Sequence, residues 1–76
     1  MVIARFSNET ADQLLLMVEP WATLVSVPAG SKFAVHYPAP TSRADTSYAE
    51  VHDDMLRFWC EGETFEVEID GKIILT

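Results

Sequence analysis

The sequence is poor in cysteine, glycine and positive charge, and each shortage excludes a class of protein. Cys60 is the only cysteine among the 76 residues, so no disulfide can form within the chain, which is typical of a reducing compartment. The three glycines are scattered, and neither a phosphate-binding glycine loop nor a G-x-S-x-G element is present. Five basic residues are dispersed among twelve acidic ones with no basic stripe, which argues against nucleic-acid binding.

Long apolar runs are also missing. The longest, residues 14–18, is far below the roughly 20 residues that cross a bilayer, and the N-terminal residues lack the charged and apolar regions of a signal peptide. We therefore expect a single domain over residues 1–76 that is cytoplasmic and has no membrane partner. Hydrophobic residues nevertheless make up 49% of the chain, and a small domain with this much apolar side chain often self-associates, so a homodimer is a further expectation.

Charge is distributed unevenly along the chain. Residues 1–43 carry three basic and three acidic side chains, whereas residues 44–76 carry two basic and nine acidic ones, which accounts for the whole formal charge of −7. Such a field repels nucleic acids and membrane surfaces and attracts basic partners. The charge pattern therefore favours a basic protein as the binding partner.

The C-terminal segment gives the clearest prediction of local structure. Apolar and acidic residues alternate strictly over residues 65–70, a period of two that is typical of a half-buried strand. Asp70-Gly71 follows, and then a β-branched run, which predicts a type I′ hairpin because both central positions need a positive φ. We expect strands over residues 64–69 and 72–76. The acidic side chains that would share the solvent face are Glu66, Glu68 and Asp70.

Most of the remaining chain also predicts strands. Residues 38–47 are rich in Pro, Ser and Thr and are expected to form a mobile loop. Residues 8–19 allow two interpretations: a helix capped by Ser7 or Asn8, or a strand over residues 14–19 after a loop with at most one helical turn. The surrounding strands favour the second. The further strands are expected over residues 21–27, 32–37, 48–52 and 55–60, with turns at 28–31 and 53–54.

Six to eight short strands in a chain of this size predict an all-β fold. The expected architecture is a small antiparallel β-sandwich or barrel with at most one short helical turn. Glu19-Pro20-Trp21, followed by Pro28-Ala29-Gly30, resembles a pattern of short bacterial β-rich proteins in which an acidic tail closes the chain. The resemblance covers residues 14–35 in detail. It implies a compact β fold, and no activity, cofactor or catalytic residue is attached to it.

The first hypothesis for function is a non-enzymatic protein–protein interaction module that needs no cofactor and binds a basic protein through an acidic strand face. Trp21 is its candidate aromatic anchor, because tryptophan is frequent at binding hot spots. Cys60 is a weak candidate nucleophile because neighbouring acidic residues raise the pKa of a thiol, so we predict no catalytic residue. The predicted partner-binding residues are Glu63, Glu66, Glu68, Asp70 and Trp21.

Two alternatives belong to other classes. The Pro-x-Gly turn also occurs in cupin-like barrels, which hold a small ligand or metal, although the His-rich motif of that family is missing here. In that hypothesis Glu50 and His52 lie on the same side of a strand, and His36 joins them as a third ligand. The other alternative is a structural homo-oligomer.

Overall fold

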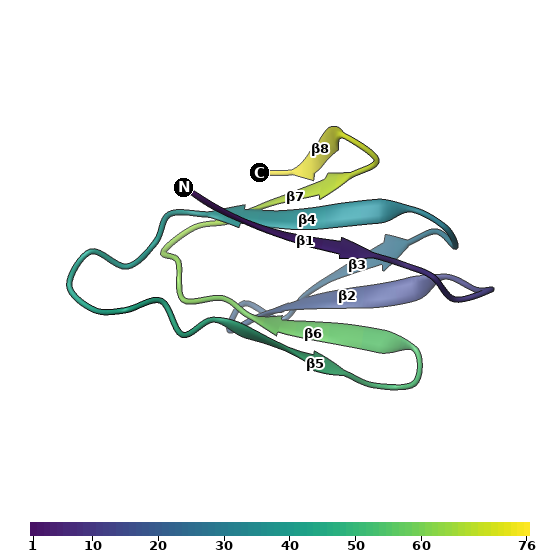
Figure 1. Ribbon diagram of the computed structural model, residues 1–76, viewed down its shortest axis with the longest axis horizontal. Coiled ribbons are helices and arrows are strands. Elements are labelled where there is room, and N and C mark those ends of the chain that lie inside the picture. The colour runs from purple at the N-terminus through teal and green to yellow at the C-terminus, as the bar shows by residue number, and fades with distance from the viewer.

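The protein is built from β-strands alone. The computed structural model describes residues 1–76, and these contain eight strands and no helix, so no helix meets the length and apolarity of a membrane span. The strands are β1 Val2–Ser7, β2 Leu14–Glu19, β3 Thr23–Val27, β4 Lys32–Tyr37, β5 Tyr48–Val51, β6 Met55–Trp59, β7 Glu66–Ile69 and β8 Lys72–Leu75. Two four-stranded sheets, in the orders β1-β4-β7-β8 and β3-β2-β6-β5, stack as a small sandwich (Figure 1). The all-β prediction is confirmed in its sandwich form.

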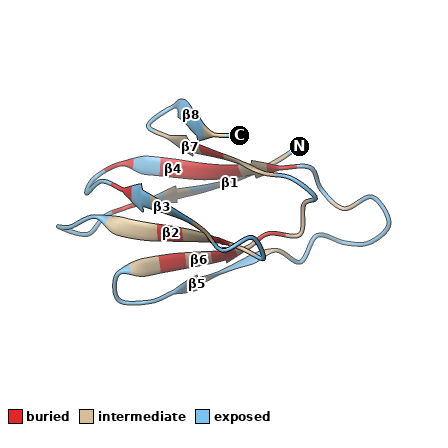
Figure 2. Cartoon of the chain, turned by 180° about the vertical axis from the view of Figure 1, so that it is seen from behind, coloured by how far each residue is buried: buried red, intermediate tan, exposed pale blue.

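The core lies between the two sheets because side chains alternate along each strand. Val35 of β4 and Val67 of β7 are paired in register, and both are fully buried. Phe6 of β1 stacks on Phe33 of β4 at 5.3 Å between ring centroids. The same ring meets Phe58 of β6 edge-on at 6.0 Å, so one aromatic cluster joins the two sheets. Figure 2 shows the buried residues concentrated in the central strands, whereas the edge strands β5 and β8 are mostly exposed.

The hairpin between β7 and β8 is confirmed. Asp70 has a φ of 50° and Gly71 a φ of 84°, the positive values that a type I′ turn requires at both central positions. Val67 is buried, so Glu66 and Glu68 on either side of it point to the outer face of the sheet. The acidic alternation read from the sequence therefore does place these two carboxylates on a strand face.

The pairing of β2 with β6 differs from the sequence prediction. The other five strand pairs are antiparallel, as expected, but β2 and β6 run parallel. Leu16 lies opposite Leu56 and Val18 opposite Phe58, and all four are buried. No tight turn joins these strands, so burial of apolar side chains from both holds them side by side. Of the two alternatives for residues 8–19, the strand is confirmed.

Asn8 closes one end of the sandwich, although the sequence suggested it only as a helix cap. Its side chain is buried, and Nδ2 donates to the carbonyl oxygens of Asp12, Val27 and Pro28 at 3.0, 3.2 and 3.1 Å. Oδ1 accepts hydrogen bonds from the amide and the hydroxyl of Thr10. One neutral amide thereby ties the loop after β1 to the turn between β3 and β4.

Candidate binding groove

Two of the four acidic residues predicted to form a partner face are engaged within the protein. Glu68 Oε1 lies 2.7 Å from Nε2 of His36 on the neighbouring strand. Asp70 accepts hydrogen bonds from the Ser31 hydroxyl at 2.7 Å and the Lys32 amide at 3.0 Å, and these two bonds, that of Ser31 first, lower the pKa of its carboxyl. Both carboxylates thus stabilise the sheet around the β7–β8 hairpin.

The other two, Glu63 and Glu66, form no ion pair and no side-chain hydrogen bond within the chain. Glu63 lies in the connection between β6 and β7, and Glu66 is the first residue of β7. Asp53 and Asp54, in the turn between β5 and β6 at the opposite end of the sandwich, are equally unpaired. The single acidic face expected from the sequence is therefore divided, and only part of it has carboxylates available to a partner.

Asp45 anchors the long loop over residues 38–47. Its carboxylate accepts hydrogen bonds from the Tyr37 hydroxyl at 2.6 Å and from the amide and hydroxyl of Ser47. These bonds, that of the Ser47 side chain first and that of Tyr37 next, lower the pKa of Asp45. The loop that composition suggested to be mobile is thus fixed to the sandwich by an acidic residue.

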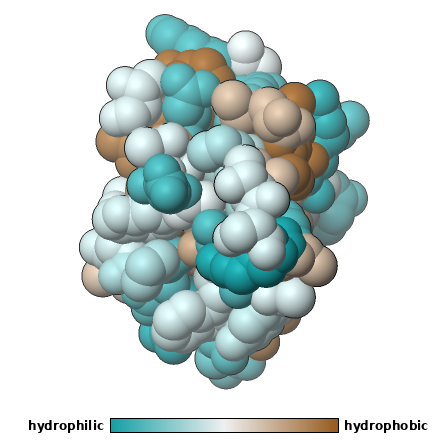
Figure 3. Space-filling model, turned by 90° about the vertical axis from the view of Figure 1, so that its left-hand side faces the viewer, coloured by the Kyte–Doolittle hydropathy of each residue, from teal (hydrophilic) through white to brown (hydrophobic).

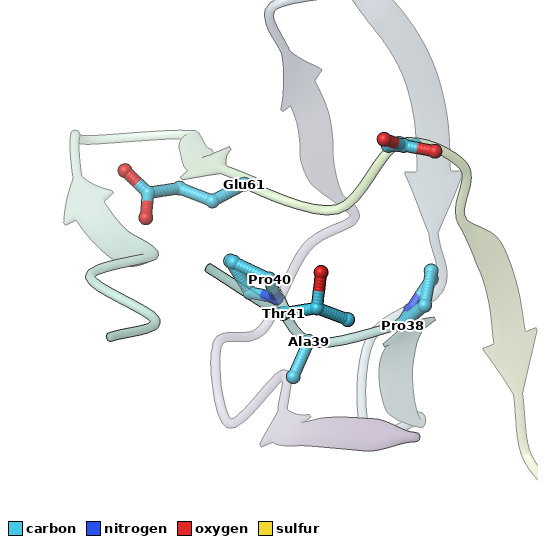
Figure 4. A pocket seen from close by; sticks show the side chains of 6 residues that line it. Pro38, Ala39, Pro40, Thr41 and Glu61 are labelled. Carbon is cyan, nitrogen blue, oxygen red and sulfur yellow. The ribbon is translucent and has the colours of Figure 1, made fainter. Parts of the chain in front are cut away.

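Glu61 holds the same loop from the other side. Its Oε1 accepts hydrogen bonds from the Arg43 guanidinium at 2.6 Å and from the Thr46 amide at 2.9 Å, and the Thr46 amide is the main cause of its lowered pKa. In Figure 4 the Glu61 carboxylate points away from Pro40 and the Thr41 hydroxyl points toward the segment that carries Glu61. A small hollow of about 180 Å³ lies there, lined by Pro38, Ala39, Pro40, Thr41, Glu61 and Glu63.

Trp21 lies beside Phe65 at the end of the sandwich that carries this loop. The Trp21 ring, in the turn between β2 and β3, is 4.7 Å from the Phe65 ring between centroids and remains 40% exposed. The two rings share a hollow of about 350 Å³ with the unpaired Glu63. Its lining is Trp21, Thr23, Glu63, Thr64, Phe65, Leu75 and Thr76.

A second hollow, of about 250 Å³, contains Glu66 and shares Thr64, Phe65 and Thr76 with the first. We call the two together the Trp21 groove: it runs past Phe65, with Trp21 and Glu63 in one hollow and Glu66 in the other. Figure 3 looks at this end of the molecule, and hydrophobic surface gathers in its upper half among hydrophilic patches. Phe65 begins the alternating segment over residues 65–70, and nothing in its spacing from Trp21 signals their contact.

The metal-ligand set proposed from the sequence is not assembled. His52 Nε2 lies 3.7 Å from Glu50 Oε1, but His36 is on β4, in the other sheet, where it faces Glu68. Glu50 and His36 point to the opposite outer faces of the sandwich, so the prediction that the three converge is wrong. No group of three or more potential metal ligands occurs in the structure.

Cys60 is buried in the core, and burial is the main cause of its raised thiol pKa. The sequence attributed that shift to neighbouring charge, which acts through Asp45 and Glu61 as a smaller cause. A buried thiol with a raised pKa is a poor nucleophile, because the thiolate is the reactive form.

Comparison with protein-family models, with curated proteins and with solved structures finds no match for the chain. Its function is therefore inferred from the chemistry of the groove. An aromatic face beside unpaired carboxylates suits a cation, because the ring and the carboxylates attract positive charge together.

Proposed function

We propose that this protein binds a basic segment of another protein in the Trp21 groove and performs no catalysis. The observation that supports it is the 40% exposed Trp21 ring, tilted against Phe65 in the same hollow as the unpaired Glu63. A lysine or arginine side chain lying over Trp21 would gain about 0.5–2 kcal/mol from the ring, depending on how completely water is excluded. Glu63 then supplies the opposite charge.

Glu66 extends the site to a second cation. It lies in the adjoining hollow on the far side of Phe65, so a segment with two basic side chains can place one against Glu63 and one against Glu66. The one basic side chain of the loop, Arg43, is held by Glu61, and His36, which lines the same hollow as Glu66, faces Glu68. The two groove carboxylates therefore keep their charge for the partner, and long-range attraction raises the association rate.

A titration with a short lysine-rich peptide tests the proposal. In a two-dimensional NMR spectrum of the isotopically labelled protein, we expect the peptide to shift the Trp21 indole signal and the amides of Thr64 and Phe65. Replacing both groove carboxylates (Glu63→Gln with Glu66→Gln) should weaken the peptide about tenfold, the loss of roughly 1.4 kcal/mol. Binding should also weaken as salt is added, since the charges are at the surface.

The matched control is Asp53→Asn with Asp54→Asn, which removes the same two charges from unpaired carboxylates at the opposite end of the sandwich. This variant should bind the peptide almost as tightly as the unmodified protein. Equal weakening by both double variants would show that only net charge matters. Peptide-induced shifts centred on residues 52–54 would equally contradict a binding site at Trp21.

A further inference from the structure

The outer face of the β3-β2-β6-β5 sheet is largely apolar and nothing in the chain covers it. In one row across the sheet, Leu24 of β3 lies beside Met17 of β2, which lies beside Arg57 of β6. A second row pairs Leu15 with Met55. Leu24 is 52% exposed, and the others on this face keep part of their surface in water. The strand register therefore gathers aliphatic and thioether side chains on one unpartnered surface.

Two aromatic residues extend the apolar surface toward the edge strand β5. Tyr48 of β5 is 55% exposed and stacks on Trp59 of β6, with 6.4 Å between ring centroids and 20° between ring planes. The Trp59 indole N–H donates to Glu50 Oε1 at 3.1 Å. Exposed tyrosine and tryptophan rings with such fixed geometry are common in the centres of protein interfaces.

Charge on this face nearly cancels. Its charged side chains are Arg57, Glu19 and Glu50, a net of −1, so the rest of the chain carries −6 of the net charge of −7. A basic partner gains little from such a surface. A second copy of this acidic chain, in contrast, meets the least repulsion when it approaches through this face.

Arg57 adds a specific reason for self-pairing. Its contacts with the Glu19 and Glu50 carboxylates, 3.4 and 3.9 Å long, are ion-pair distances, and although its Nε is buried and out of a partner's reach, the side chain is 34% exposed. A guanidinium has five N–H donors, so this one retains donors for carboxylates of a partner. The same face carries two carboxylates, so two copies related by a two-fold axis can satisfy each other.

We infer that the β3-β2-β6-β5 outer face is a homodimer interface, in which two copies pack sheet against sheet. The face offers about ten side chains, fewer than the 20–30 residues a side of a standard stable interface. The dimer is therefore weak and reversible, and its dissociation constant falls in the micromolar range or above.

Sedimentation equilibrium of the unmodified protein from about 5 to 500 µM tests the inference. The average mass should rise with concentration from one copy to two. Leu24→Glu should raise the dissociation constant at least tenfold, because it replaces the most exposed aliphatic side chain of the face by a charge and adds a third carboxylate to it. Leu24 is half exposed in the monomer, so this variant should unfold at nearly the same temperature as the unmodified protein.

Ile74→Glu is the matched control. Ile74 is 45% exposed on the edge strand β8 of the other sheet, so the substitution adds the same charge at a similarly exposed isoleucine. Its dissociation constant should stay within about twofold of the original. A protein that remains monomeric at the highest concentration overturns the inference, and so does equal loss of dimer in both variants. Concentration-dependent amide shifts on β1, β4, β7 and β8, rather than on the other sheet, would also overturn it.

Discussion

The two ends of the sandwich are closed by different chemistry. At one end, the buried and neutral side chain of Asn8 binds three carbonyl oxygens and two groups of Thr10. At the other, the surface carboxylates of Asp45 and Glu61 hold the loop over residues 38–47. The candidate binding groove lies at the second end.

Removing a buried amide and removing an exposed carboxylate differ in how much stability is lost and in how that loss depends on pH. Losing the amide removes five hydrogen bonds at once, three donated by Nδ2 and two accepted by Oδ1, and this cost does not depend on pH. Losing an exposed carboxylate costs less, because water replaces it, and its contribution disappears when it is protonated. The loop at the groove end therefore responds to acid, whereas the hydrogen bonds of Asn8 do not. At the Asn8 end only the surface carboxylate of Asp70, whose pKa is also lowered, shares this response.

The largest expected effect is that of Asn8→Ala. It removes one donor each from the Asp12, Val27 and Pro28 carbonyl oxygens, together with the acceptor of both Thr10 bonds, and should lower the free energy of unfolding by about 3 kcal/mol. Urea unfolding followed by tryptophan fluorescence measures this change. Gln13→Ala, which removes an exposed hydrogen bond to Ser26 at the same end, serves as the control and should cost less than about 0.5 kcal/mol. Similar losses in both variants would contradict the special role of Asn8.

Gly62→Ala should have the next largest effect, at the groove end. A Cβ added at Gly62 would lie 2.8 Å from Tyr37 Cβ, 3.0 Å from the Thr64 carbonyl oxygen and 3.1 Å from that of Pro38. These atoms belong to the backbone or adjoin it, so they yield only at a cost, about 1–3 kcal/mol for an overpacked site. The same urea measurement applies. An unchanged urea concentration at the midpoint of unfolding would contradict this prediction, because it would mean that the β6–β7 connection moves away from the loop without cost.

Asp45→Asn tests the pH contrast directly and should have the smallest effect on stability. The pKa of Asp45 is lowered below its ordinary value of 3.8, so the carboxylate stabilises the folded protein above that pH and its contribution is lost as the pH falls through the lowered value. The difference in unfolding temperature between Asp45→Asn and the unmodified protein should be present at neutral pH. It should shrink progressively as the pH falls below 3.8.

The difference caused by Asn8→Ala should persist over the same pH range, because no titration is involved. Thermal unfolding followed by circular dichroism at several pH values provides both comparisons. If the Asp45→Asn difference were equally large in acid and at neutral pH, its hydrogen bonds to Tyr37 and Ser47 would not depend on the charge.

Local rules predict most of the fold because they act over a few residues. Asp70-Gly71 between two apolar runs fixes the hairpin, since the turn geometry and the alternation agree. The parallel pairing of β2 with β6 escapes such rules, because distant segments meet only through buried side chains such as Val18 and Phe58. The role of Asn8 is not predicted by local rules either, because asparagine suits both a helix cap and a buried position that bonds several backbone groups.

The candidate site was predictable only in its composition. The sequence predicts Trp21, Glu63 and Glu66 as partner-binding residues, and in the structure the three line two adjoining hollows. Whether a carboxylate is free or engaged depends on neighbours from other strands, such as His36 opposite β7 or Ser31 near the hairpin turn. Sequence spacing carries no information about those neighbours, so Glu68 and Asp70 could not be separated from the other two.

The strand order has a consequence for how the chain acquires its fold. Each sheet combines strands from both halves of the sequence: β1 and β4 with β7 and β8, and β3 and β2 with β6 and β5. While the ribosome has produced only the first half, β2 and β4 each keep one side with unpaired backbone amides and carbonyls. Such open edges invite pairing with other nascent chains. The acidic second half covers both edges, so its translation is the step that ends this exposure.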